Sequence, residues 1–257
     1  MAAPIDGRRP VVHVLIAVKH LAHAKSRLAT LLAATDRRQL VLAMLTDTIL
    51  AAKSAPEVSA LTVVTPDVDV ADAARRAGAS VFADPHPGTE YSDNPQSALA
   101  STSSEAGLNA ALTAASDSAL HVDSSATIIA LQADLPALRP GELSAAIAAA
   151  RQFRRAIVVD RHGTGTAALI VTGSDVTPTA SSPTRPHLDP QFGADSANRH
   201  VACGAIALKG TWPGLRTDVD TAEDIRAVAE LGVGPHTRAL LPSTTNALKS
   251  HSEKPQH

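Results

Sequence analysis

The sequence predicts an α/β sandwich with a mostly parallel sheet. Short β-branched runs alternate with longer alanine-rich stretches along most of the 257 residues, and this alternation is typical of parallel strands covered by helices. Hydrophobic residues make up 44% of the chain and the formal net charge is −2, so a sizeable core is expected and a wholly disordered chain is excluded. We expect one domain over residues 11–240, since no linker or internal repeat divides it.

The hydrophobic pattern places the elements in chain order. Strands are predicted where short β-branched or apolar runs occur, at residues 11–18, 61–64, 80–83, 127–131, 156–159, 167–171 and 204–208. Helices are predicted over the longer stretches between them, at residues 35–54, 70–77, 142–153 and 221–231. In the first helix Leu40, Met44 and Leu45 share one face, and Gly78 ends the second.

Two segments lack this pattern. Residues 84–105 contain prolines, serines and little apolar content, which is typical of a mobile surface loop. Residues 241–257 are polar and without periodicity, so we expect a disordered tail.

The apolar run at residues 11–18 has a second interpretation. Arg8 and Arg9 precede it and Ala22-His23-Ala24 resembles a cleavage site, so a signal peptide is the alternative. The β-branched residues and the interrupting His13 favour a buried strand. No apolar run approaches the ~20 residues that a membrane-spanning helix needs, and we expect a cytoplasmic protein.

Composition also limits the partners. Trp212 and Tyr91 are the single examples of their types, so an aromatic-stacking surface for nucleic acid is not expected. Cys203 is the only cysteine, which excludes an internal disulfide and a cysteine-based zinc site. We expect small-molecule ligands, without nucleic acid or membrane, and nothing in the sequence supports an oligomer.

A loop rich in cations follows the first predicted strand. Lys19, Lys25 and Arg27 lie in it, at a place where open α/β sheets usually bind ligands. Ammonium and guanidinium groups are suited to phosphate oxygens, although a solvated basic face is an equally good interpretation. Neither a Walker loop nor a G-x-G-x-x-G turn is present, so the two standard glycine cradles for phosphates are absent.

Three aspartates follow or precede predicted elements. Asp134 comes just after a strand, where a carboxylate can help to hold Mg²⁺, although an ordinary turn is the favoured alternative. Asp218 and Asp220 are two residues apart, so in an extended segment both face the same side. The alternative for Asp220 is a place at a helix start, because Thr221 and Asp224 have the spacing of a capping box.

Two glycine-containing turns offer backbone amides and hydroxyls to an anion. Residues 160–166 end with Thr166, and residues 191–196 end with Ser196, which is one helical turn from His200. Each turn alone is more often an ordinary turn. The two turns together with the basic loop and the three separated aspartates, mostly at strand ends, are a less ordinary combination than any one of them.

The ordered set of motifs resembles one enzyme family over residues 11–238. In chain order the motifs are Val18-Lys19, Ala24-Lys25-Ser26-Arg27-Leu28, Gly107-Leu108-Asn109, Asp134-Leu135-Pro136, Gly163-Thr164-Gly165-Thr166, Phe192-Gly193 with Ser196 and His200, and Asp218-Val219-Asp220-Thr221. They resemble the guanylyltransferases that act on phosphoenolpyruvate or 2-phospho-L-lactate in coenzyme F-420 biosynthesis, with the actinobacterial phosphoenolpyruvate type most similar. The resemblance implies a nucleotidyltransferase-like (Rossmann-like) three-layer α/β sandwich with a mixed sheet, and the use of Mg²⁺.

The resemblance also implies roles for individual residues. The phosphoenolpyruvate site is matched by Thr166, Gly193 and Ser196. The metal site is matched by Asp134, Asp218 and Asp220. The nucleotide is expected to contact Lys19, Lys25, Arg27 and, through the guanine, Asn109. The residues expected to act in catalysis are Lys19, Lys25, Asp134, Asp218 and Asp220.

The expected reaction joins a phosphate oxygen of phosphoenolpyruvate to the α-phosphorus of GTP and releases pyrophosphate. The attacking phosphate is already anionic, so positioning and charge neutralisation would carry the catalysis. The same transfer to 2-phospho-L-lactate or 3-phosphoglycerate is an alternative. A glycosyltransferase with a D-x-D metal site and a non-catalytic nucleotide-binding regulator are alternatives of other classes.

Overall fold

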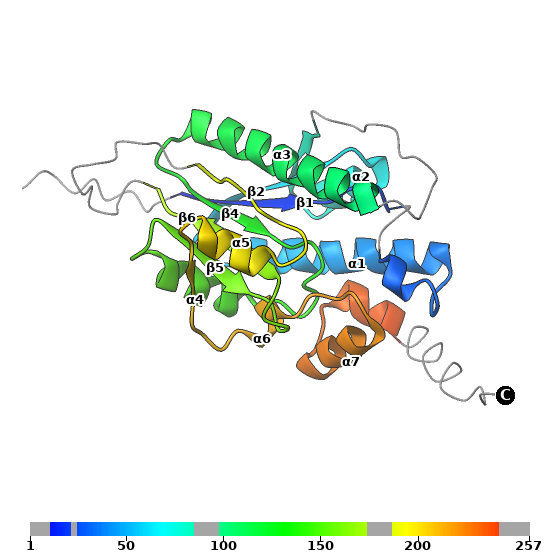
Figure 1. Cartoon of the computed structure of the whole chain (residues 1–257). Helices are drawn as coiled ribbons and strands as arrows, with labels where there is room; N and C mark the ends of the chain where they lie inside the picture. Colours follow the sequence, from blue (N-terminus) through cyan, green and yellow to red (C-terminus); the bar gives the residue numbers. More distant parts are fainter. Residues whose placement is uncertain (1–10, 22–24, 85–97, 174–186, 242–257) are drawn as a thin grey trace, which may run out of the picture.

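A mixed sheet forms the middle layer of an α/β sandwich in the computed structural model (Figure 1). The structure describes residues 11–21, 25–84, 98–173 and 187–241. The strands are β1 (Val12–Ala17), β2 (Val58–Thr65), β3 (Ser80–Ala83), β4 (Thr127–Leu131), β5 (Arg155–Val159), β6 (Thr166–Val171) and β7 (Ile206–Ala207). Their order across the sheet is β3-β2-β1-β4-β6-β5-β7.

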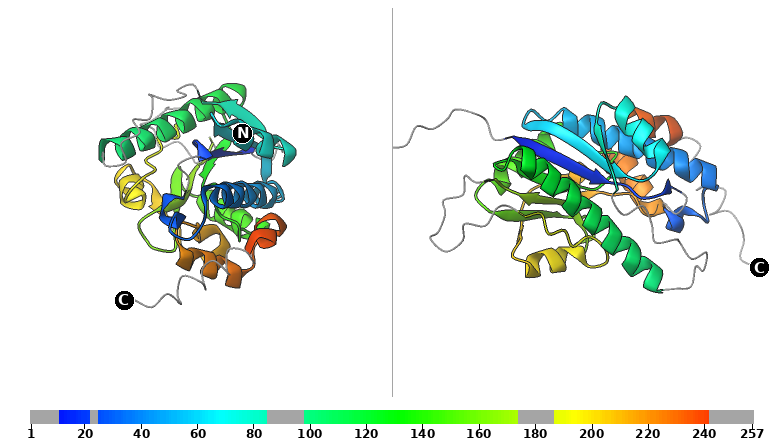
Figure 2. Two further views of the ribbon diagram at one scale, coloured as in Figure 1. Left: turned by 90° about the vertical axis from the view of Figure 1, so that its right-hand side faces the viewer. Right: turned by 90° about the horizontal axis from the view of Figure 1, so that it is seen from above.

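Helices cover both faces of this sheet. They are α1 (Ala34–Lys53), α2 (Val68–Arg76), α3 (Ala98–Val122), α4 (Pro140–Ala150), α5 (Ser196–Ala202), α6 (Pro213–Arg216) and α7 (Ala222–Leu231). One hydrophobic core unites α1, α2, α4 and α7 with the sheet, and a second unites α3 and α5 with the opposite face. Figure 2 shows α3 and α1 on opposite sides of the strands.

The central strands are almost entirely apolar because both of their faces are buried. In β1, Val14 and Ile16 face the core of α1, whereas Leu15 faces the core of α3. In β4, Ile129 and Ile128 divide in the same way. Burial on both faces explains the apolar runs in the sequence. It also confirms that residues 11–18 contain a buried strand.

The direction of β6 brings distant residues to one edge of the sheet. Strands β3, β2, β1 and β4 are parallel, but β6 is antiparallel to both β4 and β5. The start of β6 therefore lies beside the end of β4, where Gln132 N–H donates to the Ala167 carbonyl at 3.0 Å. The mostly parallel, mixed sheet is the one that was predicted.

The largest correction concerns α3. Residues 84–105 are predicted above to form a surface loop, but the helix α3 begins at Ala98 and continues to Val122. Serine and threonine obscure the helical pattern, and the helix is stabilised by tertiary packing of Ala111, Leu112 and Ala115 in the second core. Residues 85–97 of that predicted loop lie outside the described residues.

Smaller differences occur near the C-terminus. The strand predicted at residues 204–208 is reduced to the two residues of β7. Leu241, predicted to begin the tail, is helical, as are the described residues from 235 onward. Asp47 of α1 caps this segment by accepting hydrogen bonds from the backbone of His236 and Thr237, and residues 242–257 lie outside the described residues. No helix in the described ranges combines the length and apolar character needed to cross a membrane.

Candidate active site

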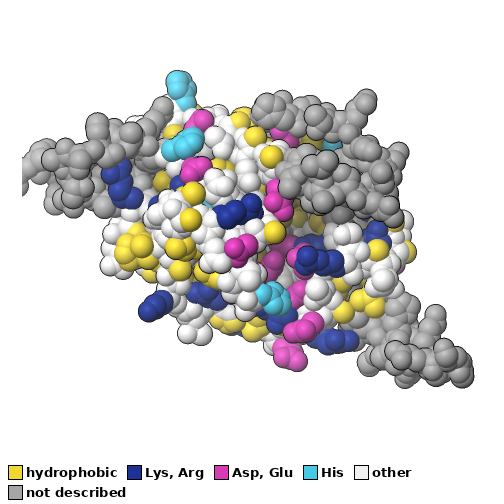
Figure 3. Space-filling model, in the orientation of Figure 1, with side chains coloured by type: hydrophobic (Ala, Val, Ile, Leu, Met, Phe, Trp, Pro, Cys, Tyr) yellow, Lys and Arg dark blue, Asp and Glu magenta, His cyan; other side chains and the backbone are white. Residues whose placement is uncertain are grey.

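A cluster of opposite charges lies where β1 and β4 end. Lys25 Nζ forms ion pairs with Asp134 and, at 2.8 Å, with Asp220. Arg27 Nη1 lies 3.6 Å from Asp220. The Lys25 and Asp134 side chains are only 12% and 13% exposed, whereas Arg27 extends into solvent. Figure 3 shows acidic and basic side chains gathered side by side on the face toward the viewer.

Local backbone geometry places Lys25 at this point. Its φ of 55° is left-handed, a conformation that costs a residue with a Cβ roughly 1–2 kcal/mol. The residue directly precedes a short 3-10 helix at Ser26–Leu28, which the fully buried Leu28 anchors. Burial alone would lower the pKa of Lys25, but attraction to Asp134 and Asp220 raises it, so the ammonium stays charged.

Asp218 is the third carboxylate of this cluster. Burial, reinforced by repulsion from Asp134 and Asp220, raises the pKa of Asp218 to about 7. Its Oδ1 is buried and accepts no hydrogen bond within the described part of the chain. A buried oxygen without a donor, next to two more carboxylates, is suited to a hard cation.

The helix cap and the charged cluster use different residues of one segment. Thr221 and Asp224 form a capping box at the start of α7. Asp224 also accepts a hydrogen bond from the Asp220 backbone at 3.1 Å and pairs with Arg161 at 2.7 Å. Burial opposes ionisation of Asp224, but its hydrogen bonds, first from Thr221, lower its pKa to about 2. The Asp220 carboxylate remains available to Lys25.

The three aspartates are not arranged around a common point. Across the described residues, no three His, Cys, Asp or Glu side chains are positioned to hold a metal ion together. Between Asp134 and Asp220 lies the Lys25 ammonium instead. The donor set, all carboxylate and with one unpaired buried oxygen, has the chemistry that Mg²⁺ prefers, but the Lys25 ammonium lies between two of its members.

A second cluster, of hydroxyls around a histidine, lies at the start of β6. Thr166 Oγ1 is 2.9 Å from His200 Nδ1, and Ser196 Oγ is 3.2 Å from Thr166 Oγ1. All three residues are buried. Because Gln132 Nε2 donates to the Thr166 carbonyl at 3.3 Å, this hydroxyl cluster lies beside the segment that carries Asp134.

The turn before α5 holds a carboxylate from α3. Gly193 has a φ of 127°, and a Cβ at this position would collide with the Glu105 carboxylate. Glu105 accepts a hydrogen bond from the Ala194 N–H at 3.2 Å and lies 3.8 Å from Arg199 Nη2. The predicted anion turn therefore binds an anion of the chain itself.

The other predicted anion turn is filled in the same way. Asp160 Oδ1 accepts a hydrogen bond from the Thr164 N–H at 3.1 Å, and the Asp160 N–H donates to the Gly165 carbonyl at 3.0 Å. The Thr164 carbonyl accepts from the Ala197 N–H of α5 at 3.0 Å. The two turns are thus joined, and Thr166 is held beside Ser196.

Comparison with known proteins assigns the family. The family model described as "Guanylyl transferase CofC like" matches residues 12–92. Phosphoenolpyruvate guanylyltransferase of Rhodococcus opacus is 48% identical over 242 residues, which cover 94% of this chain and 95% of that protein. The enzyme of the same name from Nocardia farcinica is 49% identical over 234 residues, covering 91% and 92%. The chain belongs to the phosphoenolpyruvate guanylyltransferase family.

A solved structure supports the fold of this guanylyltransferase family member. A protein from Desulfovibrio desulfuricans G20, described as a nucleotide-diphospho-sugar transferase, matches with a TM-score of 0.62 over 93% of this chain and 97% of that one. At 13% identity the likeness concerns the fold alone. The resemblance to the family and the nucleotidyltransferase-like α/β fold class are both confirmed.

In this guanylyltransferase family member, the Gly107-Leu108-Asn109 motif of α3 contacts both sides of the site. Gly107 leaves room for the Lys19 ammonium, which a Cβ would displace. Asn109 Nδ2 donates to the Phe192 carbonyl at 3.0 Å, and its Oδ1 accepts from the Phe192 N–H at 2.9 Å. Asn109 therefore holds the Gly193 turn with both ends of its amide, and its expected contact with guanine stays a prediction.

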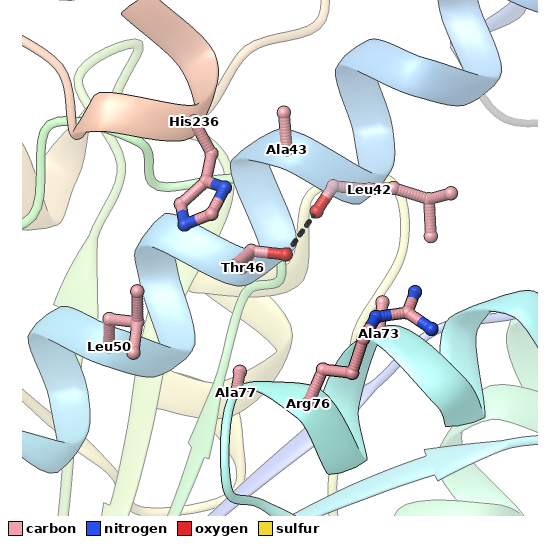
Figure 4. A pocket seen from close by; sticks show the side chains of 8 residues that line it. All are labelled: Leu42, Ala43, Thr46, Leu50, Ala73, Arg76, Ala77 and His236. Atoms are coloured by element: carbon pink, nitrogen blue, oxygen red, sulfur yellow. Dashed lines mark hydrogen bonds between the residues drawn. The ribbon is translucent and has the colours of Figure 1, made fainter.

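An open groove of about 340 Å³ lies elsewhere on the molecule (Figure 4). It runs between α1, α2 and the C-terminal helical segment, with Arg76 and His236 at its sides. None of the predicted site residues lines this groove. The clusters at the sheet edge remain the candidate site.

Sequence reasoning missed several residues that position the site. They are Glu105, Gln132, Arg161 and Arg199. Gln132 directly follows β4 and Arg161 lies two residues after β5, both at the ligand-binding edge, so their places in the chain were a usable signal. Glu105 had no such signal, because its partner Ala194 is 89 residues away.

Proposed function

We propose that this protein transfers GMP from GTP to phosphoenolpyruvate, releasing pyrophosphate and forming enolpyruvoyl-2-diphospho-5′-guanosine for coenzyme F-420 biosynthesis. The observation that carries the proposal is the 48% identity, over nearly the whole chain, to a protein named for this acceptor and this transfer. The adjoining charged and hydroxyl clusters support it, because the reaction must bring two anionic substrates together. Both substrates are cytoplasmic metabolites, so we propose the cytoplasm as the place of reaction.

On this proposal, the charged cluster receives the triphosphate. Lys25 and Arg27 would exchange their present contacts with Asp220 for phosphate oxygens, and Lys19 would approach from its place beside Gly107. The phosphate of the acceptor is already anionic and needs no general base. The chain contributes by positioning the two substrates and neutralising their charge.

The charge of this cluster supports a role for a divalent cation. With the pKa of Asp218 raised to about 7, the carboxylates of Asp134 and Asp220 already balance the cations Lys25 and Arg27. The cluster therefore has no excess positive charge for a triphosphate. We propose that these three aspartates hold Mg²⁺. Bound there, the ion would offset charge on the triphosphate and on the departing pyrophosphate.

The hydroxyl cluster is the proposed acceptor site. Thr166, Ser196 and the Gly193 turn present neutral donors rather than cations. Such donors would orient a small acid through directional hydrogen bonds rather than through ion pairs. The Ala194 N–H of this turn donates a hydrogen bond to the Glu105 carboxylate, so it is suited to an anionic oxygen.

The decisive experiment supplies GTP and Mg²⁺ with phosphoenolpyruvate, 2-phospho-L-lactate or 3-phosphoglycerate in turn. Pyrophosphate release and the product mass are measured for each acceptor. We expect the highest kcat/KM with phosphoenolpyruvate and a product that contains GMP. Release of a nucleoside diphosphate from a sugar nucleotide would indicate the glycosyltransferase instead, and GTP binding without turnover would indicate the regulator.

A further inference from the structure

His200 is completely buried and is hydrogen-bonded through both ring nitrogens. The Gln191 backbone N–H lies 2.9 Å from Nε2, and Thr166 Oγ1 lies 2.9 Å from Nδ1. A backbone N–H can only donate, so Nε2 must present its lone pair. A neutral imidazole carries one proton, which therefore resides on Nδ1. His200 thus donates to Thr166 and does not accept from it.

The surroundings keep this ring neutral. Burial, followed by the positive charge of Arg155, lowers the pKa of His200 to about 4. A hydrogen bond to the Ser196 backbone and the attraction of Asp189 oppose this shift, and the charge of Arg199 adds to it. The Phe192 ring packs on the imidazole in an edge-to-face arrangement, with the ring centres 5.2 Å apart. Both the charge state and the tautomer are thereby determined at neutral pH.

The direction of that bond changes what the two hydroxyls can offer. Thr166 and Ser196 carry two hydroxyl protons, and one of these is used in their mutual hydrogen bond. Because His200 donates its own proton to Thr166, neither hydroxyl has to donate to the imidazole ring. With the opposite tautomer, the pair would donate to Nδ1 and both protons would be used internally. With His200 protonated at Nδ1, one hydroxyl proton of the pair is left to donate to a ligand.

We infer that His200 is a positioning residue that makes the Thr166–Ser196 pair a hydrogen-bond donor to an anionic oxygen of the acceptor. The inference rests on the proposed function, since it concerns the acceptor of that reaction. The oxygen belongs to a carboxylate or to a phosphate, and both groups accept but do not donate when ionised. His200 itself acts only through Thr166.

The tautomer is tested without any turnover. ¹⁵N NMR of the imidazole nitrogens distinguishes the two neutral tautomers and the charged ring, and the His200→Gln variant identifies the His200 signals among the 11 histidines. We expect a neutral ring protonated at Nδ1 at pH 7. A ring protonated at Nε2, or at both nitrogens, would overturn the inference even if the enzyme makes the proposed product.

A matched pair of variants tests the consequence for the acceptor. The amide of His200→Asn lies near the position of Nδ1 and can restore the donor to Thr166. The longer amide of His200→Gln lies near the position of Nε2 and leaves Thr166 without that donor. A neutral hydrogen bond corresponds to roughly a 2- to 10-fold change in affinity, so KM for phosphoenolpyruvate should rise more in the Gln variant by about this factor.

The GTP KM and the thermal midpoint of both variants serve as controls. A purely structural role for His200 would raise both substrates' KM values together or follow the loss of stability, and either result contradicts the inference. Inhibition by pyruvate and by inorganic phosphate shows which acid group is bound, because only the inhibitor that uses the hydroxyl pair should weaken in His200→Gln. If neither inhibitor is affected, the pair does not bind the acceptor. Absence of pyrophosphate with every acceptor would refute the proposed function and leave the tautomer test intact.

Discussion

Replacing Asp220 by asparagine separates the two roles of the segment before α7. The change retains the shape of the side chain, and the Asp220 backbone N–H keeps its bond to Asp224. The carboxylate is 46% exposed and pairs with Lys25 and Arg27, so its loss should alter the free energy of unfolding by less than about 1 kcal/mol. The thermal midpoint should move by only a few degrees.

Activity should respond far more strongly than stability. A neutral amide is a weaker ligand for a hard cation than a carboxylate is. If charge stabilisation by the proposed metal contributes several kcal/mol to the barrier, kcat of Asp220→Asn should fall roughly 100-fold or more. Pyrophosphate release at saturating GTP and phosphoenolpyruvate, measured across a Mg²⁺ titration, gives this number.

Thr221→Ala is the matched control, because Thr221 accepts the capping bond from the Asp224 N–H at 3.3 Å. Loss of this cap should cost about 1 kcal/mol of stability with most of the turnover retained. Nearly wild-type turnover of Asp220→Asn at saturating Mg²⁺ would refute the metal role. Asp220 would then have only a structural role before the capping box of α7.

Three further predictions concern the other groups. Lys25→Ala should weaken GTP more than phosphoenolpyruvate in calorimetry of each ligand, because the ammonium is placed on the triphosphate side, and unchanged GTP affinity would contradict that placement. Ser196→Ala should raise KM for phosphoenolpyruvate by roughly 10- to 150-fold, the range for a hydrogen bond to a charged group, and a selective rise in the GTP KM would mean that the two sites are exchanged. Asp224, with its pKa lowered to about 2 from 3.8, should contribute about 2 kcal/mol of stability above pH 4 that is lost as the pH falls toward 2. Denaturant unfolding of wild type and Asp224→Asn should therefore converge at low pH, and a constant difference would show that ionisation of Asp224 does not contribute.

Most of the architecture follows from local patterns. The strand at Thr127–Leu131 and the helix at Ala222–Leu231 were predictable because a buried strand is apolar throughout and a capping box has a fixed spacing. Helix α3 was not predictable in this way, since its serine-rich start resembles a loop until the packing against β1 is known. Intrinsic propensity is weak there and tertiary contacts decide the outcome.

The sequence by itself determined most of the elements, the family and the residue types available for binding phosphates and acids, because these depend on spacing within a few residues. Only the tertiary structure decided which of them meet. Lys25 pairs with aspartates 109 and 195 residues away. The antiparallel direction of β6 brings Thr166 next to the end of β4. The proton on His200 is likewise decided by a backbone N–H that lies nine residues before it in the chain. Such contacts depend on strand order and direction, for which the hydrophobic pattern of a single chain has no local signal.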